Sequence, residues 1–246
     1  MTAIKLLNLS KQYDKKTVVD NLSLEINEGE FFALLGFNGA GKTVTIKMLS
    51  GLTIPSSGDA YIYDYSIKND MDKIKSLINI SPQETAIANN LTVSENLEFV
   101  ARIYDYSKED AKRKAIELMN KFSLTDRKDD KAKKLSGGFK RRLSIAMALI
   151  SDPKILFLDE PTLGLDIRSR KDLWNILLNL KDKITIIMTT HYLEEVIALA
   201  DKIAIIDKGQ LKISGTLDHL KEQTKLENLE DILLSLTESK ENIWKL

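Results

Sequence analysis

One stretch of eight residues, GFNGAGKT at 36–43, constrains this chain more than any other. It matches the pattern G-x-x-x-x-G-K-[ST] and follows directly on the apolar run FFALL at 31–35. Glycines let backbone N–H groups approach a phosphate closely, and a helix that begins at such a loop directs its first N–H groups at the same anion. The apolar run predicts a buried strand, and residues 43–50 predict a helix. The motif therefore stands in the strand–loop–helix context that a phosphate-binding loop requires.

Within this loop we expect two side chains to act directly on the ligand. Lys42 should reach the β- and γ-phosphates, and the hydroxyl of Thr43 should hold Mg²⁺. The other residues expected to contact the nucleotide, mainly through the backbone, are Gly36, Phe37, Asn38, Gly39, Ala40, Gly41 and Val44. The alternative is a glycine-rich turn with an incidental Lys-Thr pair, and the flanking strand and helix disfavour it.

A second apolar strand, KILFLDE at 154–160, ends in two acidic residues. A site for phosphoryl chemistry needs a carboxylate that organises the metal ion. We expect Asp159 to act on Mg²⁺, mainly through its water, and Glu160 to activate the attacking water as general base. Alone, the pair could be a strand end that meets solvent; together with the loop at 36–43 it favours catalysis. The sequence contains no N-K-x-D motif, which favours ATP over GTP.

The pattern of apolar residues predicts the fold class. Alternation at 22–26 and again at 59–65 is typical of half-buried antiparallel strands. From 92 to 150 the pattern becomes helical, and Thr92 and Glu95 have the spacing of a capping box.

Further along, apolar strands at 154–160, 185–191 and 202–207 alternate with helical segments, which indicates βαβ units. We therefore predict an α/β fold with a mostly parallel core sheet, an antiparallel β subdomain and a helical subdomain insertion.

Composition limits the class of protein. The 246 residues contain 36 Lys and Arg and 36 Asp and Glu, so the net charge is zero, which argues against a dedicated nucleic-acid binder. There is no cysteine, so disulfides and cysteine-based zinc sites are excluded and a cytosolic location is favoured. No apolar run approaches the ~20 residues of a membrane span, and we expect no secretory signal.

A second glycine-containing loop, LSGG at 135–138, precedes Lys140, Arg141 and Arg142 and an apolar helical run. Cations at the start of a helix oppose the macrodipole, but they suit an anion site built from free N–H groups. The span of 94 residues between Lys42 and Ser136 (136 minus 42) does not decide which phosphate this loop serves.

The order of the motifs is specific: a phosphate loop, LSGG, ILFLDE, LGLD and then a lone histidine that ends a strand. This order resembles the nucleotide-binding subunit of ABC transporters, from Tyr13 to about residue 215. The resemblance implies an ABC-type ATPase of the P-loop NTPase class, working as a head-to-tail dimer. Ser136, Gly137 and Gly138 of one subunit would then complete the ATP site of the other.

The resemblance assigns roles to four further residues. Tyr13 matches the aromatic that stacks on adenine, although alone it would be an ordinary surface tyrosine. Gln83 matches the glutamine that approaches Mg²⁺ and the attacking water, beside the docking region of the transmembrane partner. Asp166 matches a loop that crosses between subunits, and it could equally cap the helix that follows. His191 matches the histidine that contacts the γ-phosphate, whereas a lone histidine is usually structural.

Two positions depart from the family pattern. Val44 replaces the usual Thr or Ser, so one hydroxyl contact to the α-phosphate is missing, a loss of ~1.5–3 kcal/mol at most. Phe139 replaces the usual Gln after LSGG. A hydrophobic residue at this position is frequent among exporter-type members of the family. The stretches at 89–110 and 190–211 and the tail at 226–237 also resemble the ATPases of ABC-2 type exporters.

The resemblance implies an ATPase domain over residues 1–215, with the helical subdomain at about 90–150, and a helical extension over 216–246. It implies an enzyme that hydrolyses ATP with Mg²⁺ and powers export through a separate transmembrane permease. Its partners would be that permease and a second ATP-binding subunit, identical or different, with no nucleic acid. The subunit would be cytoplasmic, peripheral on the inner face of the cell membrane.

Three alternatives stay open at this point. A non-transport ATPase acting in DNA repair or on ribosomes would carry long coiled coils or two such domains, and neither pattern is present. An importer ATPase is disfavoured only by the resemblance. A catalytically silent binding subunit is suggested by Val44 and opposed by Glu160.

Overall fold

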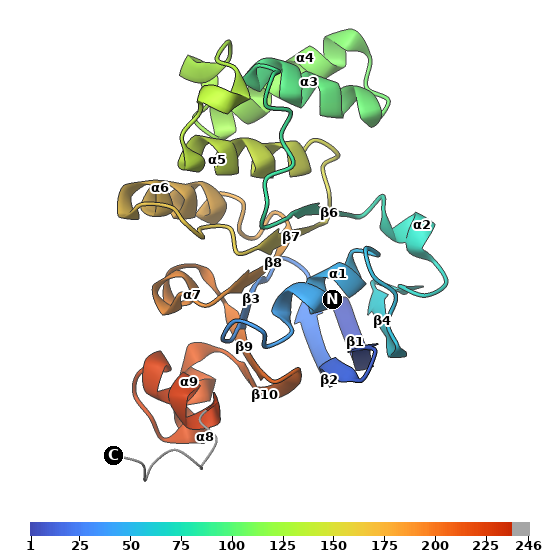
Figure 1. Cartoon of the computed structure of the whole chain (residues 1–246), viewed down its shortest axis with the longest axis vertical. Helices are drawn as coiled ribbons and strands as arrows, with labels where there is room; N and C mark the ends of the chain where they lie inside the picture. The colour runs from blue at the N-terminus through green and yellow to red at the C-terminus, as the bar shows by residue number, and fades with distance from the viewer. Residues whose placement is uncertain (238–246) are drawn as a thin grey trace. The chain divides into compact units, whose positions relative to one another are not determined.

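The computed structural model of the chain describes residues 1–237 (Figure 1). These residues form two compact units. The first unit combines Met1–Met71 with the described residues from Thr189 onward, and the second comprises Asp72–Met188. No helix in this described part of the chain has the length and apolar character needed to cross a membrane.

An antiparallel sheet of four strands forms one part of the first unit. Its strand order is β2-β1-β4-β5. The strands are β1 (Thr2–Tyr13), β2 (Lys16–Asn27), β4 (Ser57–Ile62) and β5 (Tyr65–Ser66). Leu22 and Ile26 of β2 are buried, as the alternation predicts. The single strand predicted at 59–65 is wrong, because a two-residue turn at 63–64 interrupts it and Ile62 pairs with Tyr65. Tyr63 has φ 52°, a turn conformation that alternation alone does not predict.

The first unit also contains the strand that leads to the glycine loop. All five residues of β3 (Phe31–Leu35) are buried, as the continuous apolar run predicts. This strand pairs in parallel with β9 (Lys202–Asp207), which pairs antiparallel with β10 (Gln210–Gly215). The helices of this unit are α1 (Lys42–Leu49), α7 (Leu193–Leu199), α8 (Leu217–Thr224) and α9 (Leu229–Thr237). The end of the predicted extension, 238–246, lies outside the described residues.

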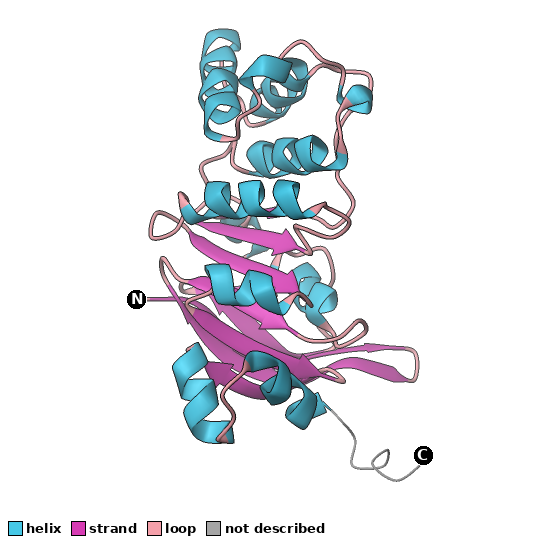
Figure 2. Cartoon of the chain, turned by 90° about the vertical axis from the view of Figure 1, so that its left-hand side faces the viewer, coloured by secondary structure: helices cyan, strands magenta, loops and turns pink. Residues whose placement is uncertain are grey.

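The second unit is mainly helical. Its parallel strands β6 (Ile78–Ser81) and β7 (Ile155–Asp159) pair directly, and α5 (Gly137–Ala148) packs on β6 on one side and on α3 on the other. Figure 2 shows α5 between these strands and the helices α3 and α4. The remaining elements are α2 (Met71–Ile74), α3 (Val93–Ile103), α4 (Lys108–Lys121), two 3₁₀ turns (Thr125–Arg127 and Ala132–Lys134), α6 (Ile167–Leu178) and β8 (Thr185–Thr190), which contains the boundary between the units.

The predicted capping box at the start of α3 is confirmed. The hydroxyl of Thr92 accepts from the N–H of Glu95 at 3.1 Å, and the Glu95 carboxylate accepts from the N–H of Thr92 at 2.7 Å. These bonds satisfy two N–H groups that the helix itself leaves unpaired. The backbone N–H and then the hydroxyl of Thr92 hold the pKa of Glu95 below its usual range.

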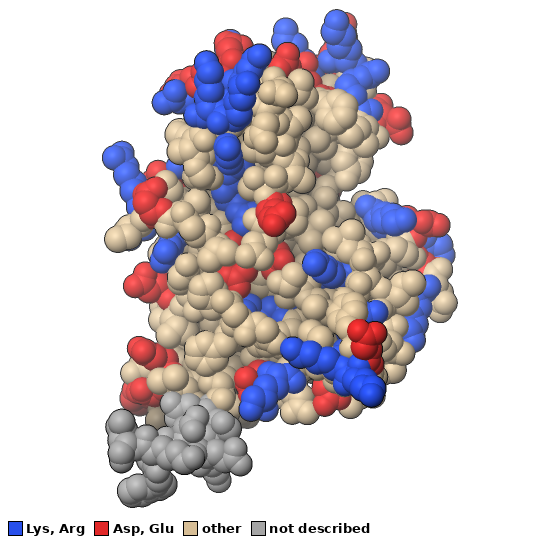
Figure 3. All heavy atoms as spheres, viewed as in Figure 1, with Lys and Arg blue, Asp and Glu red and all other residues tan. Residues whose placement is uncertain are grey.

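Charged side chains of both signs are spread over the face shown in Figure 3, in keeping with a net charge of zero.

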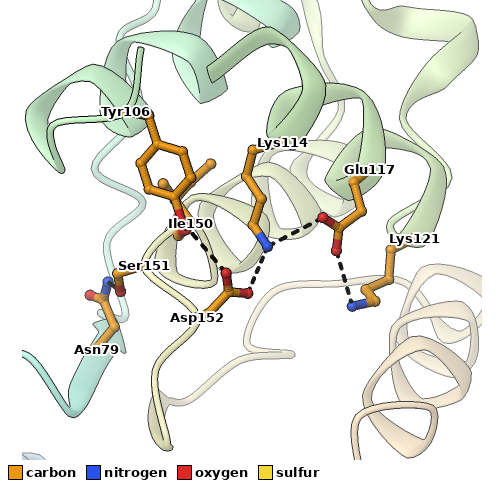
Figure 4. Close-up of polar contacts among 8 residues, drawn as sticks. All are labelled: Asn79, Tyr106, Lys114, Glu117, Lys121, Ile150, Ser151 and Asp152. Carbon is orange, nitrogen blue, oxygen red and sulfur yellow. Dashed lines mark hydrogen bonds and ion pairs between the residues drawn. The ribbon is translucent and has the colours of Figure 1, made fainter. Parts of the chain in front are cut away.

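In the second unit one lysine is largely buried between two carboxylates. Lys114 of α4 lies 2.6 Å from Asp152 and 3.3 Å from Glu117 (Figure 4). Burial lowers the pKa of Lys114, but the two carboxylates outweigh that effect and raise it overall. These two contacts therefore stabilise the fold at neutral pH, and the contribution of the raised Lys114 pKa is lost as the pH rises through it.

We expect Thr92→Ala to lower the free energy of unfolding by about 1 kcal/mol, because the first turn of α3 loses its side-chain acceptor. Urea unfolding followed by circular dichroism measures this change. Thr92→Ser keeps the hydroxyl and is the matched control, with a loss well below that of alanine. Equal losses in the two variants would show that the cap is not the source of the stability.

Candidate functional site

The glycine loop joins β3 to α1 in the first unit, as predicted. Gly39 and Gly41 have φ values of 84° and 103°, a region in which a side chain is strained. Residues 37–39 are exposed, whereas Ala40, Gly41 and Lys42 are buried. The loop therefore turns its middle toward solvent and returns to the core before the helix begins.

The backbone of this loop lies against two neighbouring strands. A Cβ atom on Gly36 would lie 2.2 Å from the carbonyl oxygen of Ile206, and one on Gly41 would lie 2.7 Å from that of Val18. The N–H of Gly209 donates to the carbonyl of Ala40 at 3.0 Å. Gly36 and Gly41 are required because the backbone of another strand lies too close for a side chain, whether or not a ligand also needs glycine there.

Lys42 is the first residue of α1 and is only 5% exposed. Its ammonium group donates to the carbonyls of Gly36 and Phe37, at 2.7 and 3.2 Å. The cation therefore lies against the backbone of the loop, next to the first turn of α1. Gly41, at the N-cap, supplies no side-chain acceptor to the helix. Helix dipole, N–H groups and ammonium together favour a multiply charged phosphate at this point.

The next two residues of α1 differ in what they can offer a ligand. Thr43 and Val44 are both partly buried in the first turn. Thr43 carries a hydroxyl oxygen, a donor type that suits Mg²⁺. Val44 has no polar side-chain atom, so the expected loss of one contact to the α-phosphate remains a prediction. In residues 1–237 no cluster of three or more His, Cys, Asp or Glu side chains could hold a metal by itself. Hydroxyl, amide, water or phosphate oxygens would have to complete the ligand set.

Two other predicted residues belong to the first unit. Tyr13 ends β1 and is 44% exposed, and the ammonium of Lys11 lies 4.8 Å from the centre of its ring. One face of the tyrosine ring is thus associated with a cation. His191 directly follows β8, and its ring centre lies 4.2 Å from that of Tyr192. Their proposed roles toward adenine and the γ-phosphate remain predictions.

The second unit holds the acidic pair. All five residues of β7 are buried, Asp159 is its last residue, and Glu160 follows at once. The two side chains are 4% and 6% exposed. Glu160 has φ 47°, a left-handed conformation that is uncommon for any residue other than glycine. It also precedes Pro161, and the residue before a proline favours extended backbone. Strain of this kind costs about 1–3 kcal/mol and persists only where neighbouring groups hold it.

Gln83 lies in the same unit, two residues beyond the end of β6, and its side chain is exposed. The intervening residue, Pro82, has its carbonyl fixed by a hydrogen bond from Arg141 at 2.6 Å. Arg141 also bonds the carbonyls around Glu160. In the sequence, Arg141 is distinguished only as one of three clustered cations, with Lys140 and Arg142. The one sequence signal for a closer contact is its position three and seven residues before the small residues Ser144 and Ala148, on one helical face.

The LSGG loop begins α5. Ser136 is the N-cap residue, but its side chain makes no capping hydrogen bond. Ser136 and Gly137 are exposed, and Gly138 is buried where a Cβ would lie 2.8 Å from the hydroxyl oxygen of Ser169. The start of this helix is therefore exposed at Ser136 and Gly137 and has no side-chain cap. A role in an anion site remains a prediction.

Asp166 caps α6, which is one of the two roles predicted for it. Its carboxylate accepts from the N–H of Ser169 at 2.9 Å and from the Ser169 hydroxyl at 2.7 Å. The hydroxyl first and the N–H second lower the pKa of Asp166. The cap therefore stabilises the fold above the usual carboxyl pKa and weakens as the pH falls through the lowered value. A role between subunits remains a prediction.

The predicted residues thus divide between the units. The first unit brings together the loop residues 36–44 on one strand–loop–helix segment, and also contains Tyr13 and His191. The second contains Gln83, Ser136, Gly137, Gly138, Asp159, Glu160 and Asp166.

Comparison with known proteins yields one family. Residues 19–163 match the family model described as ABC transporter. The linearmycin resistance ATP-binding protein LnrL of Bacillus subtilis (strain 168) is 43% identical over 210 residues, which cover 85% of this chain and 68% of that protein. The phospholipid-transporting ATPase ABCA3 of Mus musculus is 40% identical over 227 residues, 91% of this chain, and this chain spans 13% of its length. A solved dimeric ATP-binding cassette in a post-hydrolysis state, with ADP and phosphate bound, has a TM-score of 0.79 and 27% identity, and covers 87% of this chain and 98% of its own.

We expect Gly36→Ala to lower both the melting temperature and the nucleotide affinity, because a carbon atom 2.2 Å from the Ile206 carbonyl forces the loop or β9 to move. Affinity, measured by titration with a fluorescent ATP analogue, should fall at least about tenfold, or ~1.4 kcal/mol. Gly39→Ala is the matched control: it has φ 84° but no heavy atom within 4 Å of the added carbon. Its cost is limited to backbone strain of ~1–2 kcal/mol. A melting temperature and an affinity for Gly36→Ala no worse than those of Gly39→Ala would contradict this interpretation.

Proposed function

Because the chain belongs to the ABC transporter family, we propose that it is the ATP-binding and ATP-hydrolysing subunit of an exporter, with a separate permease. The observation that carries this proposal is the loop at 36–43, in which Lys42 and the first turn of α1 form a site for phosphates. The exporter assignment is supported by LnrL, whose name describes a linearmycin resistance ATP-binding protein. The subunit would be held at the inner face of the membrane by its permease.

The first unit supplies the binding of ATP. The ammonium of Lys42 exchanges its bonds to the carbonyls of Gly36 and Phe37 for bonds to the β- and γ-phosphates. The backbone N–H groups of the loop, including that of Val44, hold the remaining phosphate oxygens. Tyr13 stacks on adenine, and His191 contacts the γ-phosphate.

The second unit supplies the chemistry of hydrolysis. Glu160 accepts a proton from the attacking water, and Gln83 orients that water. Thr43 and Asp159 provide oxygen donors for Mg²⁺, which when bound neutralises charge on the phosphates. Burial of Glu160 keeps its carboxylate away from bulk water, and the constrained backbone limits the directions in which the side chain can point.

Two copies are needed for a complete site in this proposal. Ser136 and the N–H groups of Gly137 and Gly138 meet the γ-phosphate held by Lys42 of the second copy. The exposure of Ser136 and Gly137 and the start of α5 without a side-chain cap support this role, and a relative of the same fold has been solved as a dimer. ATP therefore joins two incomplete sites, and loss of the γ-phosphate lets them separate. A different ATP-binding subunit could take the place of the second copy. Residues 83–92 would transmit the change to the permease.

We expect Glu160→Gln to bind ATP, to hydrolyse it about 10²–10⁴ times more slowly, and to accumulate as a dimer. The amide keeps the size of the side chain but cannot accept the proton. Size-exclusion chromatography with ATP and Mg²⁺ measures the dimer, and phosphate release measures the rate. A variant that stays monomeric, or that keeps the wild-type rate, would count against the proposed mechanism.

Ser136→Arg and Gly137→Asp should leave ATP binding by the monomer within about twofold and abolish hydrolysis, because they obstruct only the site of the other copy. Both positions are exposed, so the fold should tolerate the change. Lys42→Ala is the contrasting control, since it should lose binding and hydrolysis together. If either loop variant hydrolyses ATP normally, the shared-site proposal for residues 136–138 is wrong.

A further inference from the structure

The side chain of Arg141 lies in the interior of the second unit, 4% exposed, and connects two loops. Its Nε donates to the carbonyl of Pro161 at 2.7 Å, and one Nη donates to the carbonyl of Pro82 at 2.6 Å. The other Nη donates to the carbonyl of Glu160 at 2.7 Å and, at 3.2 Å, to that of Asp159. These four bonds fix three consecutive peptide groups in one loop and a single peptide group in the other.

The planar guanidinium is the only side chain that can make this set of bonds. It presents five N–H donors in a fixed fork, so the positions of the two loops are set relative to one rigid group. Hydrogen bonds from a charged donor are stronger than those between neutral groups. The side chain reaches this place because the face of α5 that contains Arg141 also contains Ser144, whose hydroxyl lies 3.0 Å from that of Ser81 in β6. Small residues on this face bring the helix close to the strand.

The loop that Arg141 holds contains the strained residue. Glu160 has φ 47° and precedes a proline, so its conformation is unfavourable on two counts. Carbonyls before it, within it and after it accept from Arg141. A backbone held at three successive carbonyls cannot relax to an extended conformation without losing these bonds. The backbone from which the Glu160 side chain projects is therefore held by Arg141.

We propose that Arg141 is a positioning residue for hydrolysis, which aligns both Glu160 and Gln83. It fixes the peptide groups of Glu160 directly and the peptide that precedes Gln83 through the Pro82 carbonyl. Because Arg141 belongs to α5, which begins at Ser136–Gly138, any shift of that helix moves the two loops together. This inference rests on the proposed function, and it adds a mechanical link inside one unit between the LSGG loop and the general base.

The test uses the full chain with Arg141→Met and Arg141→Lys. Methionine removes every donor, whereas lysine keeps the charge but has a single ammonium that cannot bond both loops. Lys114→Met is the matched control, because Lys114 is also a largely buried cation of this unit, bonded to Asp152 and Glu117 and not to either loop (Figure 4). The measurements are the turnover number for ATP hydrolysis, the ATP affinity, the melting temperature, and hydrogen exchange over residues 82–90 and 159–166.

We expect Arg141→Met to lower the turnover number about 10²-fold, as a displacement of ~1 Å at a reacting group does, with ATP affinity within about twofold of wild type. Arg141→Lys should lie between methionine and wild type. Both should exchange faster over 82–90 and 159–166. Lys114→Met should lower the melting temperature but keep the wild-type turnover and the wild-type exchange in these segments. If methionine at 141 prevents folding, the lysine variant decides.

Three outcomes would overturn the inference: wild-type turnover in Arg141→Lys and Arg141→Met, a loss of turnover in Lys114→Met as large as theirs, or unchanged exchange in the two segments. An inactive wild-type chain would instead count against the proposed function. In that case the comparison of hydrogen exchange still tests whether Arg141 holds the two loops.

Discussion

The contact on which the first unit depends is the approach of Gly36 to the carbonyl of Ile206. Parallel pairing of β3 with β9 brings the two backbones together at the point where β3 ends, and no side-chain carbon fits there. The chain then has to turn within a few residues, and Gly41 fits against Val18 under the same limit. Once both ends of the loop are held by backbone, Lys42 and the start of α1 have only one direction in which to face. Close backbone packing therefore shapes the loop, and in the proposed function the same glycines also bind the phosphates.

In the second unit, a side chain and not a glycine holds the constrained backbone. Its constrained residue, Glu160, is not a glycine, so the left-handed backbone is held from outside by a side chain. Two neighbouring cations of α5, Arg141 and Arg142, have different partners. Arg141 is directed to backbone carbonyls, while Arg142 pairs with Asp172 at 2.9 Å and lies over the ring of Phe139. Three cations were expected to add positive charge near an anion site. The contacts just described involve Arg141 and Arg142 but not Lys140.

Local signals predicted the parts of this protein that local physics determines. The buried strands β3 and β7, the cap at Thr92 and the cap at Asp166 follow from runs of apolar residues and from oxygen-bearing side chains at fixed spacing. The turn after Ile62 could not be predicted in this way, since alternation of apolar residues continues through it. The bonds of Arg141 could not be predicted either, because backbone carbonyls are present at every position and carry no sequence signal. Only the arrangement of β6, β7 and α5 selects which carbonyls an arginine reaches.

These two devices have a consequence for how hydrolysis can be controlled. In the proposed mechanism, ATP binding depends on the loop at 36–43 of the first unit, which packs against strands β2 and β9 and follows β3. In the proposed mechanism, activation of water depends on Glu160, whose backbone is bonded by Arg141 of the helix that begins after Ser136. In the proposed dimer, the same helix meets the nucleotide of the other copy and holds the general base of its own. A helix that is displaced from its partner's nucleotide then misaligns its own base, while ATP stays bound to Lys42. In this proposal, ATP affinity and the rate of hydrolysis depend on different residues, and those residues are fixed by different backbone contacts.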